Sequence, residues 1–201
     1  VMVGLARPEI VKFAAWPQTT LHDPAGKRTL GIVMPRISMG KEIHELYSPS
    51  HRTVSFPNAD WRFLVHAAMN CAIAFDALHK NNVVIGDVNQ GNVFVSPKAT
   101  VSMIDCDSFQ IQSNGKLFRC LVGVSHFTPP ELQTARLSEV NRSANHDNFG
   151  LAVIIFHLLF VGRHPFAGRF GGSGDMPIER AIREYRFAYS SNFSKTQMIP
   201  P

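Results

Sequence analysis

The segment between residues 83 and 104 restricts the fold of this chain more than any other. It contains three short apolar runs rich in β-branched residues, Val83–Ile85, Val93–Val95 and Val101–Ile104, with polar loops between them. Short runs of this kind, bounded by polar turn residues, are typical of strands and too brief for helices. We therefore predict three short strands, with two of them returning side by side.

Helices are predicted on both sides of these strands. Residues Asp60–Lys80 carry apolar side chains at three- and four-residue spacing, which is typical of a helix with one buried face. Residues His146–Val161 are apolar nearly all round, which predicts a helix buried on all sides. Shorter helices are predicted around Ile43–Tyr47 and, after the glycine-rich loop Gly168–Gly174, near Pro177–Tyr185.

Two hairpins complete the predicted elements. The first pairs a strand at Val11–Trp16, extended toward Leu21, with a strand at Thr29–Met34 around the turn His22–Gly26. The second spans Phe109–Cys120 and turns at Asn114-Gly115. Because strands dominate the first part of the chain and helices the second, the predicted class is α+β with a mostly helical body.

Composition excludes several classes of protein. The 201 residues are 45% apolar and 17% charged, so neither a disordered chain nor a coiled coil fits. No apolar run approaches the roughly 18 residues that span a bilayer, so no membrane partner is predicted. Three cysteines without zinc-ligand spacing predict a reduced, cytoplasmic chain. The net charge of +5 comes from dispersed basic residues, which suits a phosphate-bearing ligand better than nucleic acid.

Three polar residues stand at the ends of the short apolar runs. Asn92 follows Asp87 by five residues on one loop, and Asp105 follows Asp87 by eighteen. Strands that return side by side would bring Asn92 and Asp105 together at one end of a sheet. Paired oxygen ligands suit Mg²⁺, and a nearby carboxylate that is not a ligand can accept a hydroxyl proton. Each residue alone fits an ordinary turn, but the three together favour a site.

The segment Ala77–Gln110 resembles the catalytic and magnesium loops of the protein kinase superfamily. Gly86-Asp87 to Asn92 matches the second half of the His-Arg-Asp-x-x-x-x-Asn motif, and Asp105-Cys106-Asp107 stands where the family has Asp-Phe-Gly. Thr128-Pro129-Pro130-Glu131 resembles the Ala-Pro-Glu that closes the activation segment. His146–Gly150 resembles the start of the central helix of the C-terminal lobe. These motifs occur in the family's order, which makes the resemblance specific.

The resemblance implies a protein-kinase-like fold and a reaction. Residues 1–37 would form a partial N-terminal lobe with a hairpin and the hinge strand, and residues 38–201 a C-terminal lobe that is incomplete at its end. Such a lobe binds ATP and Mg²⁺ and transfers the γ-phosphoryl group to a Ser or Thr hydroxyl of a protein substrate. The resemblance makes Asp87 the catalytic base and Asn92 and Asp105 the metal ligands, and it implies that Asp147 braces the catalytic loop. The positions implied to contact the nucleotide are Met34, Pro35, Ile37, Phe94 and Ile104.

Several positions depart from the family pattern. Gly86 replaces the Arg that pairs with a phosphorylated activation segment, so we expect no such switch here. Asn89 replaces the Lys that helps to hold the transferred phosphate. Asp107 replaces the Gly of Asp-Phe-Gly, and its carboxylate is expected to be solvated rather than to bind a second magnesium.

Alternatives remain open because parts of the family pattern are missing. No Gly-rich phosphate loop or strand Lys was identified, so we expect this chain alone to be inactive, and we expect both of its ends to be cuts in a longer protein. A pseudokinase or scaffold that binds proteins, with or without nucleotide, fits these absences, although the joint presence of the three polar residues opposes it. The Gly86-Asp87 loop also suits a small-molecule kinase, which the Pro129-Pro130-Glu131 turn opposes.

Overall fold

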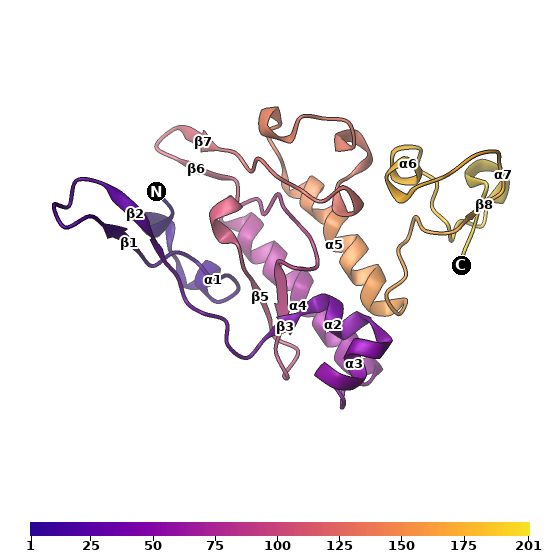
Figure 1. Ribbon diagram of the computed structural model, residues 1–201, viewed down its shortest axis with the longest axis horizontal. Helices are drawn as coiled ribbons and strands as arrows, with labels where there is room; N and C mark the ends of the chain where they lie inside the picture. Colours follow the sequence, from indigo (N-terminus) through magenta and orange to yellow (C-terminus); the bar gives the residue numbers. More distant parts are fainter.

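Two packed helices, α4 (Trp61–Lys80) and α5 (Ala144–Leu159), form the centre of the molecule in a computed structural model that describes residues 1–201 (Figure 1). Helix α4 begins where the Asp60 carboxylate accepts a hydrogen bond from the Phe63 amide (2.9 Å). Its predicted apolar face is buried, which confirms the helix. The fully buried side chains of this face include Cys71, Phe75 and Leu78.

Helix α5 starts two residues earlier than predicted. A capping box explains the start, since the Ser143 N–H donates to Nδ1 of His146 (3.1 Å) and the Ser143 side chain accepts in return. Asn148 and Ala152 on this helix are exposed, so the prediction of burial on all sides is wrong. The side that is buried includes Val153, Ile154 and Leu158.

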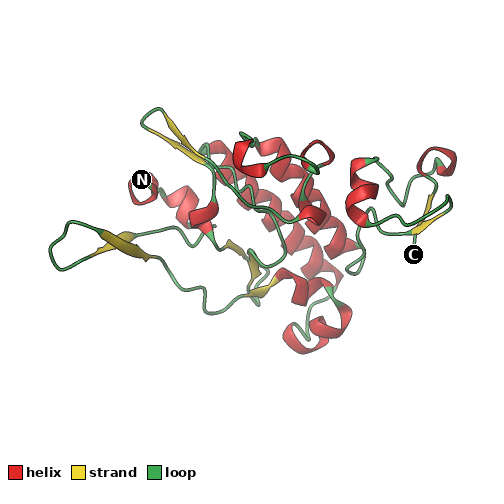
Figure 2. Ribbon diagram, turned by 45° about the horizontal axis from the view of Figure 1, so that its top comes forward, coloured by secondary structure: helices red, strands yellow, loops and turns green.

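Strands β3 (Lys41–Glu42), β4 (Val93–Val95) and β5 (Val101–Met103) form one antiparallel sheet in the order β3-β4-β5 (Figure 2). The outer residues of β4 and β5 are buried in the core, as expected for their apolar runs. At one end of the sheet the Ile104 N–H donates to the Asn92 carbonyl (3.0 Å). The two predicted strands are confirmed, and their pairing places the chain before β4 next to the chain after β5.

The run Val83–Ile85 does not form a strand of this sheet and makes only an isolated bridge. The amides of Ile85 and Gly86 instead donate to the Asp147 carboxylate. Each backbone amide offers one donor, so these two do not pair with a neighbouring strand. The prediction of a strand at this run is therefore wrong.

The first strand of the N-terminal hairpin lies later in the chain than predicted. Strand β1 (Thr19–His22) pairs with β2 (Thr29–Val33), and the hairpin projects from the body (Figure 1). The run Val11–Trp16 begins at the last residue of the short helix α1 (Pro8–Val11), and its apolar character reflects core packing, since Trp16 is fully buried. The prediction of a strand at Val11–Trp16 is therefore wrong, and only its extension toward Leu21 lies in a strand. The turn and the second strand are confirmed.

The second predicted hairpin is confirmed. Strands β6 (Ile111–Ser113) and β7 (Lys116–Phe118) are joined by Asn114 and Gly115, whose φ angles are 49° and 74°. Two successive positive φ angles are what a two-residue hairpin turn of this kind requires. Ile111 is buried, so the first strand anchors the hairpin on the core.

The remaining helices are short. Helix α2 (Ile43–Tyr47) forms where predicted, α3 (Pro49–Ser55) follows it, and α6 (Ile178–Arg183) confirms the predicted third helix. None of the helices is both long enough and apolar enough to cross a membrane. The other elements are strands β8 (Arg169–Phe170) and β9 (Met198–Ile199), helix α7 (Phe193–Thr196), and 3₁₀ turns at Met2–Leu5, Cys106–Ser108, Ser125–Phe127, Pro130–Leu132 and Leu137–Glu139.

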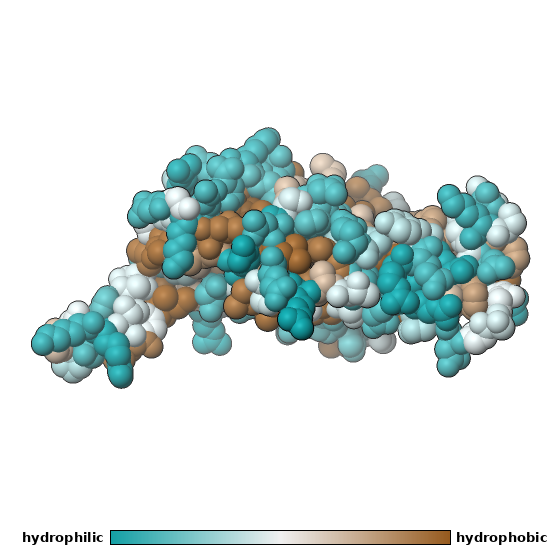
Figure 3. Space-filling view, turned by 90° about the horizontal axis from the view of Figure 1, so that it is seen from above, coloured by the Kyte–Doolittle hydropathy of each residue, from teal (hydrophilic) through white to brown (hydrophobic).

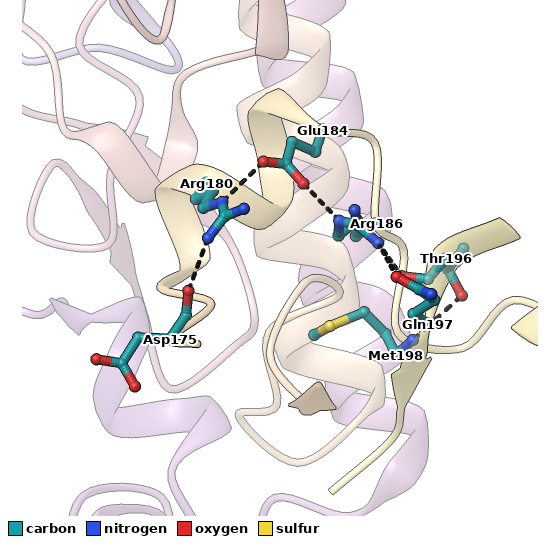
Figure 4. Close-up of polar contacts among 7 residues, drawn as sticks. All are labelled: Asp175, Arg180, Glu184, Arg186, Thr196, Gln197 and Met198. Carbon is teal, nitrogen blue, oxygen red and sulfur yellow. Dashed lines mark hydrogen bonds and ion pairs between the residues drawn. The ribbon is translucent and has the colours of Figure 1, made fainter. Parts of the chain in front are cut away.

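Polar contacts join α6 to the last residues of the chain (Figure 4). The Glu184 carboxylate accepts hydrogen bonds from Nε of Arg180 (2.7 Å) and Nε of Arg186 (2.6 Å). Arg186 Nη1 also donates to the Thr196 carbonyl (2.9 Å). These contacts tie the region after α5 into one unit beside the helical pair.

Hydrophobic side chains reach the surface where the β1–β2 hairpin joins the body (Figure 3). On the hairpin, Leu21 and Leu30 are 56% and 50% exposed. A cavity of about 480 Å³ lies between the hairpin, the N-terminal residues and β6–β7. Its apolar lining includes Met2, Ile32 and Phe118.

Candidate active site

The loop between residues 86 and 92 carries the first two predicted site residues. The side-chain nitrogen of Asn92, Nδ2, donates to the Asp87 carbonyl (3.0 Å) and to Oδ2 of the Asp87 carboxylate (3.2 Å). The other carboxylate oxygen, Oδ1, is buried and has no hydrogen-bond partner. A buried acceptor without a partner is costly, so Asp87 Oδ1 marks a point where a donor from a bound molecule would be stabilised.

Asp147 of α5 fixes the backbone at the start of this loop. Its carboxylate is 1% exposed and accepts hydrogen bonds from the Ile85 amide, the Gly86 amide and Nε2 of His79, each at 2.8 Å. Hydrogen bonds to a charged acceptor are about twice as strong as neutral ones. The contact predicted between Asp147 and the catalytic loop is confirmed, and it joins α5 to the residues just before Asp87.

Asn89 is turned into the loop rather than toward a substrate. Its side chain is 9% exposed, donates to the Asp87 carbonyl (3.2 Å) and accepts from the Gly91 amide (2.8 Å). Both ends of the amide are therefore used to shape the loop. The position at which the family has a Lys contributes loop structure here and no positive charge.

Asp105 follows β5 and lies near the carboxylate of Asp87. Its backbone is left-handed, with φ of 56° and ψ of 36°, and the residue is only partly covered by its neighbours. Partial burial raises the pKa of the Asp105 carboxyl, and the neighbouring negative charges of Asp107 and Asp87 raise it further. A cation bound among these carboxylates would relieve that repulsion.

The donor set fits a magnesium ion that is held partly by a nucleotide. The Asn92 amide uses its nitrogen within the loop, so its oxygen is free to coordinate, and Asp105 supplies a carboxylate. No group of three His, Cys, Asp or Glu side chains is arranged to hold a metal ion. Magnesium commonly takes one or two protein ligands plus phosphate oxygens and water, which is what Asn92 and Asp105 can offer.

The predicted nucleotide-contacting residues are only partly brought together. A methyl group built on Gly40 would lie 3.1 Å from Cβ of Phe94 and 3.3 Å from Cγ2 of Ile37, so both side chains border this glycine. Ile37 and Ile104 pack against the core cluster. Met34 and Pro35 lie in the linker after β2 and are half-buried.

The segment from Asp105 to Glu131, which the resemblance makes the activation segment, is ordered by local contacts. The β6–β7 hairpin forms its first half. In the second half, Thr128 donates to the Val124 carbonyl (2.9 Å), and Gln133 Nε2 donates to the Thr128 carbonyl (2.6 Å). The Pro-Pro-Glu turn is therefore held by hydrogen bonds of its own.

Two residues that shape the site could not be assigned to it from the sequence. His79 stands in no ligand-spacing pattern, and it reaches the site only because α4 ends beside Asp147. Arg142 was one of many dispersed basic residues, yet its guanidinium is buried between the catalytic loop and the activation segment. Neither residue lies in a recognisable motif, so only the fold identifies them.

Comparisons with known proteins agree with this geometry. The sequence profile of the protein kinase domain matches residues 1–197. The chain is 45% identical over 203 aligned residues to two proteins named Protein kinase YegI, from Escherichia coli strain K12 and from Escherichia coli O157:H7. The match covers 100% of this chain and 31% of each relative, so the chain spans about a third of their length.

A more distant match is to Serine/threonine-protein kinase WNG2 of Toxoplasma gondii. The identity is 29% over 140 residues, which covers 67% of this chain and 23% of that protein. The profile match extends over nearly the whole chain and includes every motif described above. The chain therefore belongs to the protein kinase family.

Proposed function

We propose that this chain is the catalytic lobe of an ATP-dependent protein kinase that phosphorylates Ser or Thr hydroxyls of a protein substrate. The observation that carries the proposal is the Asp87 carboxylate, which Asn92 orients and which lies within electrostatic reach of Asp105. Its Oδ1 is buried and has no partner, so it can accept a hydrogen bond, and then the proton, from a substrate hydroxyl. A scaffold without chemistry gives no reason for this combination.

In the proposed reaction each residue has one task. Asp87 accepts a hydrogen bond from the substrate hydroxyl and takes up its proton as the oxygen attacks the γ-phosphorus, while the bond from the γ-phosphorus to the β,γ-bridging oxygen breaks and ADP leaves. The Asn92 amide oxygen and the Asp105 carboxylate would hold Mg²⁺ against the phosphates. When bound, Mg²⁺ neutralises charge on the phosphate oxygens. Asp147 keeps the peptide before Asp87 in place.

The nucleotide is proposed to lie between the two parts of the chain. The linker from Met34 to Ile37 would contact the adenine from one side, and Phe94 and Ile104 would support it from below. In this division residues 1–37 belong to the smaller lobe and residues 38–201 to the larger one. The close approach of both Ile37 and Phe94 to Gly40 supports that arrangement.

A pseudokinase that binds nucleotide is the second candidate function. The inward-turned Asn89 favours it, because this position offers no cation to the transferred phosphate. Transition-state charge would then be stabilised less than in a kinase with Lys there. Turnover measurements separate the two candidates.

The test uses the full-length protein and three matched variants. Asp87→Asn and Asp105→Asn each remove one carboxylate of the site, and the control Asp76→Asn removes an exposed one that pairs with Lys80 on α4 (2.7 Å). Magnesium-dependent transfer of labelled γ-phosphate to dephosphorylated casein should fall about 10²–10⁴-fold in Asp87→Asn and should be abolished in Asp105→Asn.

The control variant should retain the wild-type rate. Phosphoamino-acid analysis of the product then decides between Ser or Thr and other acceptors. Equal, measurable turnover in Asp87→Asn, Asp105→Asn and wild-type protein would contradict a kinase mechanism at this site. A wild-type protein that binds ATP without any turnover would favour the pseudokinase.

A further inference from the structure

Arg142 is a buried cation without a carboxylate partner. It is 6% exposed, and no Asp or Glu oxygen lies within salt-bridge distance of its guanidinium. Nη1 donates to the Gly86 carbonyl of the catalytic loop, and Nη2 donates to the Val122 carbonyl of the activation segment. A single side chain therefore joins the two segments that form the site.

The backbone of Arg142 is itself held firmly. Its N–H donates to Oε1 of Gln110 (2.9 Å), and its carbonyl accepts from Nε2 of the same side chain (2.7 Å). Gln110 is buried and follows Phe109 at the start of the activation segment. The guanidinium is thus presented from a fixed backbone, which limits the entropy lost in forming its two contacts.

Gly86 and Cys120 explain why the cation comes from position 142. Gly86 has φ of +74°, and a Cβ there would lie 2.5 Å from Cβ and 2.7 Å from Sγ of Cys120. No larger residue fits at this place without moving the activation segment. An Arg directly before Asp87 is therefore incompatible with the observed packing, and Arg142 reaches the Gly86 carbonyl from another side.

A second glycine makes room for the guanidinium. A Cβ on Gly123 would lie 3.2 Å from Nη2 and 3.3 Å from Nη1 of Arg142, closer than most side-chain contacts. The absence of a side chain at Gly123 lets the backbone of the activation segment pass close to the guanidinium. The packing around Gly86, Cys120 and Gly123 thus leaves space for the guanidinium of Arg142 and for no further side chain.

We propose that Arg142 is a positioning residue that holds Asp87 and the activation segment in their working arrangement without any phosphate. The Gly86 peptide is fixed at both ends, because Asp147 accepts from its N–H (2.8 Å) and Arg142 donates to its carbonyl. Asp87 follows directly. Phosphorylation orders such segments through new bonds to arginine, and here the arginine is already occupied by two carbonyl groups.

This inference rests on the proposed function, and it is tested in the full-length protein with Arg142→Met and Arg142→Lys. Met keeps the length of the side chain without its donors, and Lys keeps the charge but reaches only one carbonyl. The control Arg136→Met removes an exposed arginine of the same segment, 83% exposed and paired only with Glu139. Rates are measured with casein as the acceptor.

We expect Arg142→Met to lower kcat about 10²-fold, because small displacements of a catalytic group have effects of that size. KM for ATP should change less than about twofold, since Arg142 contacts neither metal ligand. Arg142→Lys should give an intermediate kcat, and Arg136→Met the wild-type value. Hydrogen exchange of residues 120–124 should speed up in Arg142→Met and less in Arg142→Lys.

Two results would overturn the proposal. One is wild-type kcat and wild-type exchange in a folded Arg142→Met. The other applies if Arg142→Met does not fold: a folded Arg142→Lys with wild-type kcat and exchange would show that only a buried charge is needed. If Asp87→Asn proves fully active, the proposed function fails on its own, and exchange at residues 120–124 still decides whether Arg142 holds the segment.

Discussion

The carboxylate of Asp147 serves three donors at once, and its replacement by Asn tests that role. In Asp147→Asn one acceptor oxygen becomes an NH₂ group that faces a donor, either the Gly86 amide or the Ile85 amide with His79. We expect the free energy of unfolding to fall by about 3 kcal/mol, because removing one partner of a buried, charged hydrogen-bond network leaves the other partners unsatisfied. Urea denaturation measures it, with Asp76→Asn as the exposed control. A change below about 0.5 kcal/mol would contradict the role given to Asp147.

His164 makes stability depend on pH. Its Nδ1 accepts from the Phe166 amide (3.1 Å) and its Nε2–H donates to the His126 carbonyl (3.0 Å), which only the neutral ring can do. Burial lowers the pKa of His164 from 6.5 to about 4. The unfolded chain binds the proton near pH 6.5 and the folded chain only near pH 4. Stability is therefore full above pH 6.5 and is lost as the pH falls through this window.

The variant His164→Asn removes this titration and keeps an acceptor for the Phe166 amide. For the wild type, the His164 contribution should lower the free energy of unfolding by up to about 3 kcal/mol between pH 7 and pH 4. The variant should have a lower free energy of unfolding than the wild type at pH 7. Its free energy of unfolding should then fall less than that of the wild type between pH 7 and pH 4. Urea denaturation across this range measures both. Parallel pH curves for the two proteins would show that His164 does not titrate as its burial implies.

At the scale of elements, the activation segment is held without a phosphate. The β6–β7 hairpin, the Pro-Pro-Glu turn and the Arg142 contacts each use groups already present in the chain. We therefore expect the full-length protein with Ser113→Ala, Ser125→Ala and Thr128→Ala to keep its ATP-dependent transfer activity. The Thr128→Ala single variant must first be checked for folding, because the hydroxyl donates to the Val124 carbonyl.

The same experiment also has an outcome that contradicts this expectation. Activity that is lost in the triple variant and restored by Asp at Ser113 or Ser125 would reveal a phosphate switch. Its basic partner would then lie outside the contacts described, since Arg142 is already committed. Arg119, whose Nε donates to Asn141 (2.6 Å), would be the first residue to examine.

Local sequence pattern was sufficient where an element's own residues determine its form. Helix α4 has a regular apolar face and a cap, and β4 and β5 are β-branched runs that pair with each other. The pattern failed at Val83–Ile85, whose amides are taken by Asp147, and at Val11–Trp16, which packs as core. In both segments, contacts with parts of the chain that are distant in sequence outweigh the local preference for a strand.

The candidate site divides in the same way. Asn92 and Asp105 stand at adjoining ends of β4 and β5, and Asn92 reaches Asp87 within one loop, so local spacing was enough to predict that the three residues lie near one another. His79 and Arg142 act through contacts that depend on how α4, α5 and the activation segment pack. Such contacts have no local signature, because helix packing rather than spacing brings the residues together.

At the scale of the whole molecule, the β1–β2 hairpin leaves apolar side chains in water. Leu21 and Leu30 are the most exposed of these, and a larger exposed patch favours association. In the 201-residue chain, Leu21→Ser with Leu30→Ser should reduce binding of a hydrophobic dye and self-association. The free energy of unfolding should change by less than about 0.5 kcal/mol. Light scattering and dye fluorescence measure the effect.

A matched control for this experiment is Val54→Ser on α3. Val54 is 81% exposed but stands away from the hairpin, so its replacement should alter neither dye binding nor association. Unchanged association in the double variant would show that the hairpin surface is not what brings copies together. Equal effects of all three replacements would point to general surface hydrophobicity.

The contact between Asp147 and the catalytic loop also affects the order of folding. Asp147 lies 62 residues beyond Ile85 in the sequence, whereas α4 is built from contacts four residues apart. Closing so long a stretch of chain is slower than forming one helix. During refolding we therefore expect α4 to form before the residues around Asp87 take their shape. The candidate site is then assembled late, and the phosphoryl transfer proposed for it requires the whole lobe to be folded.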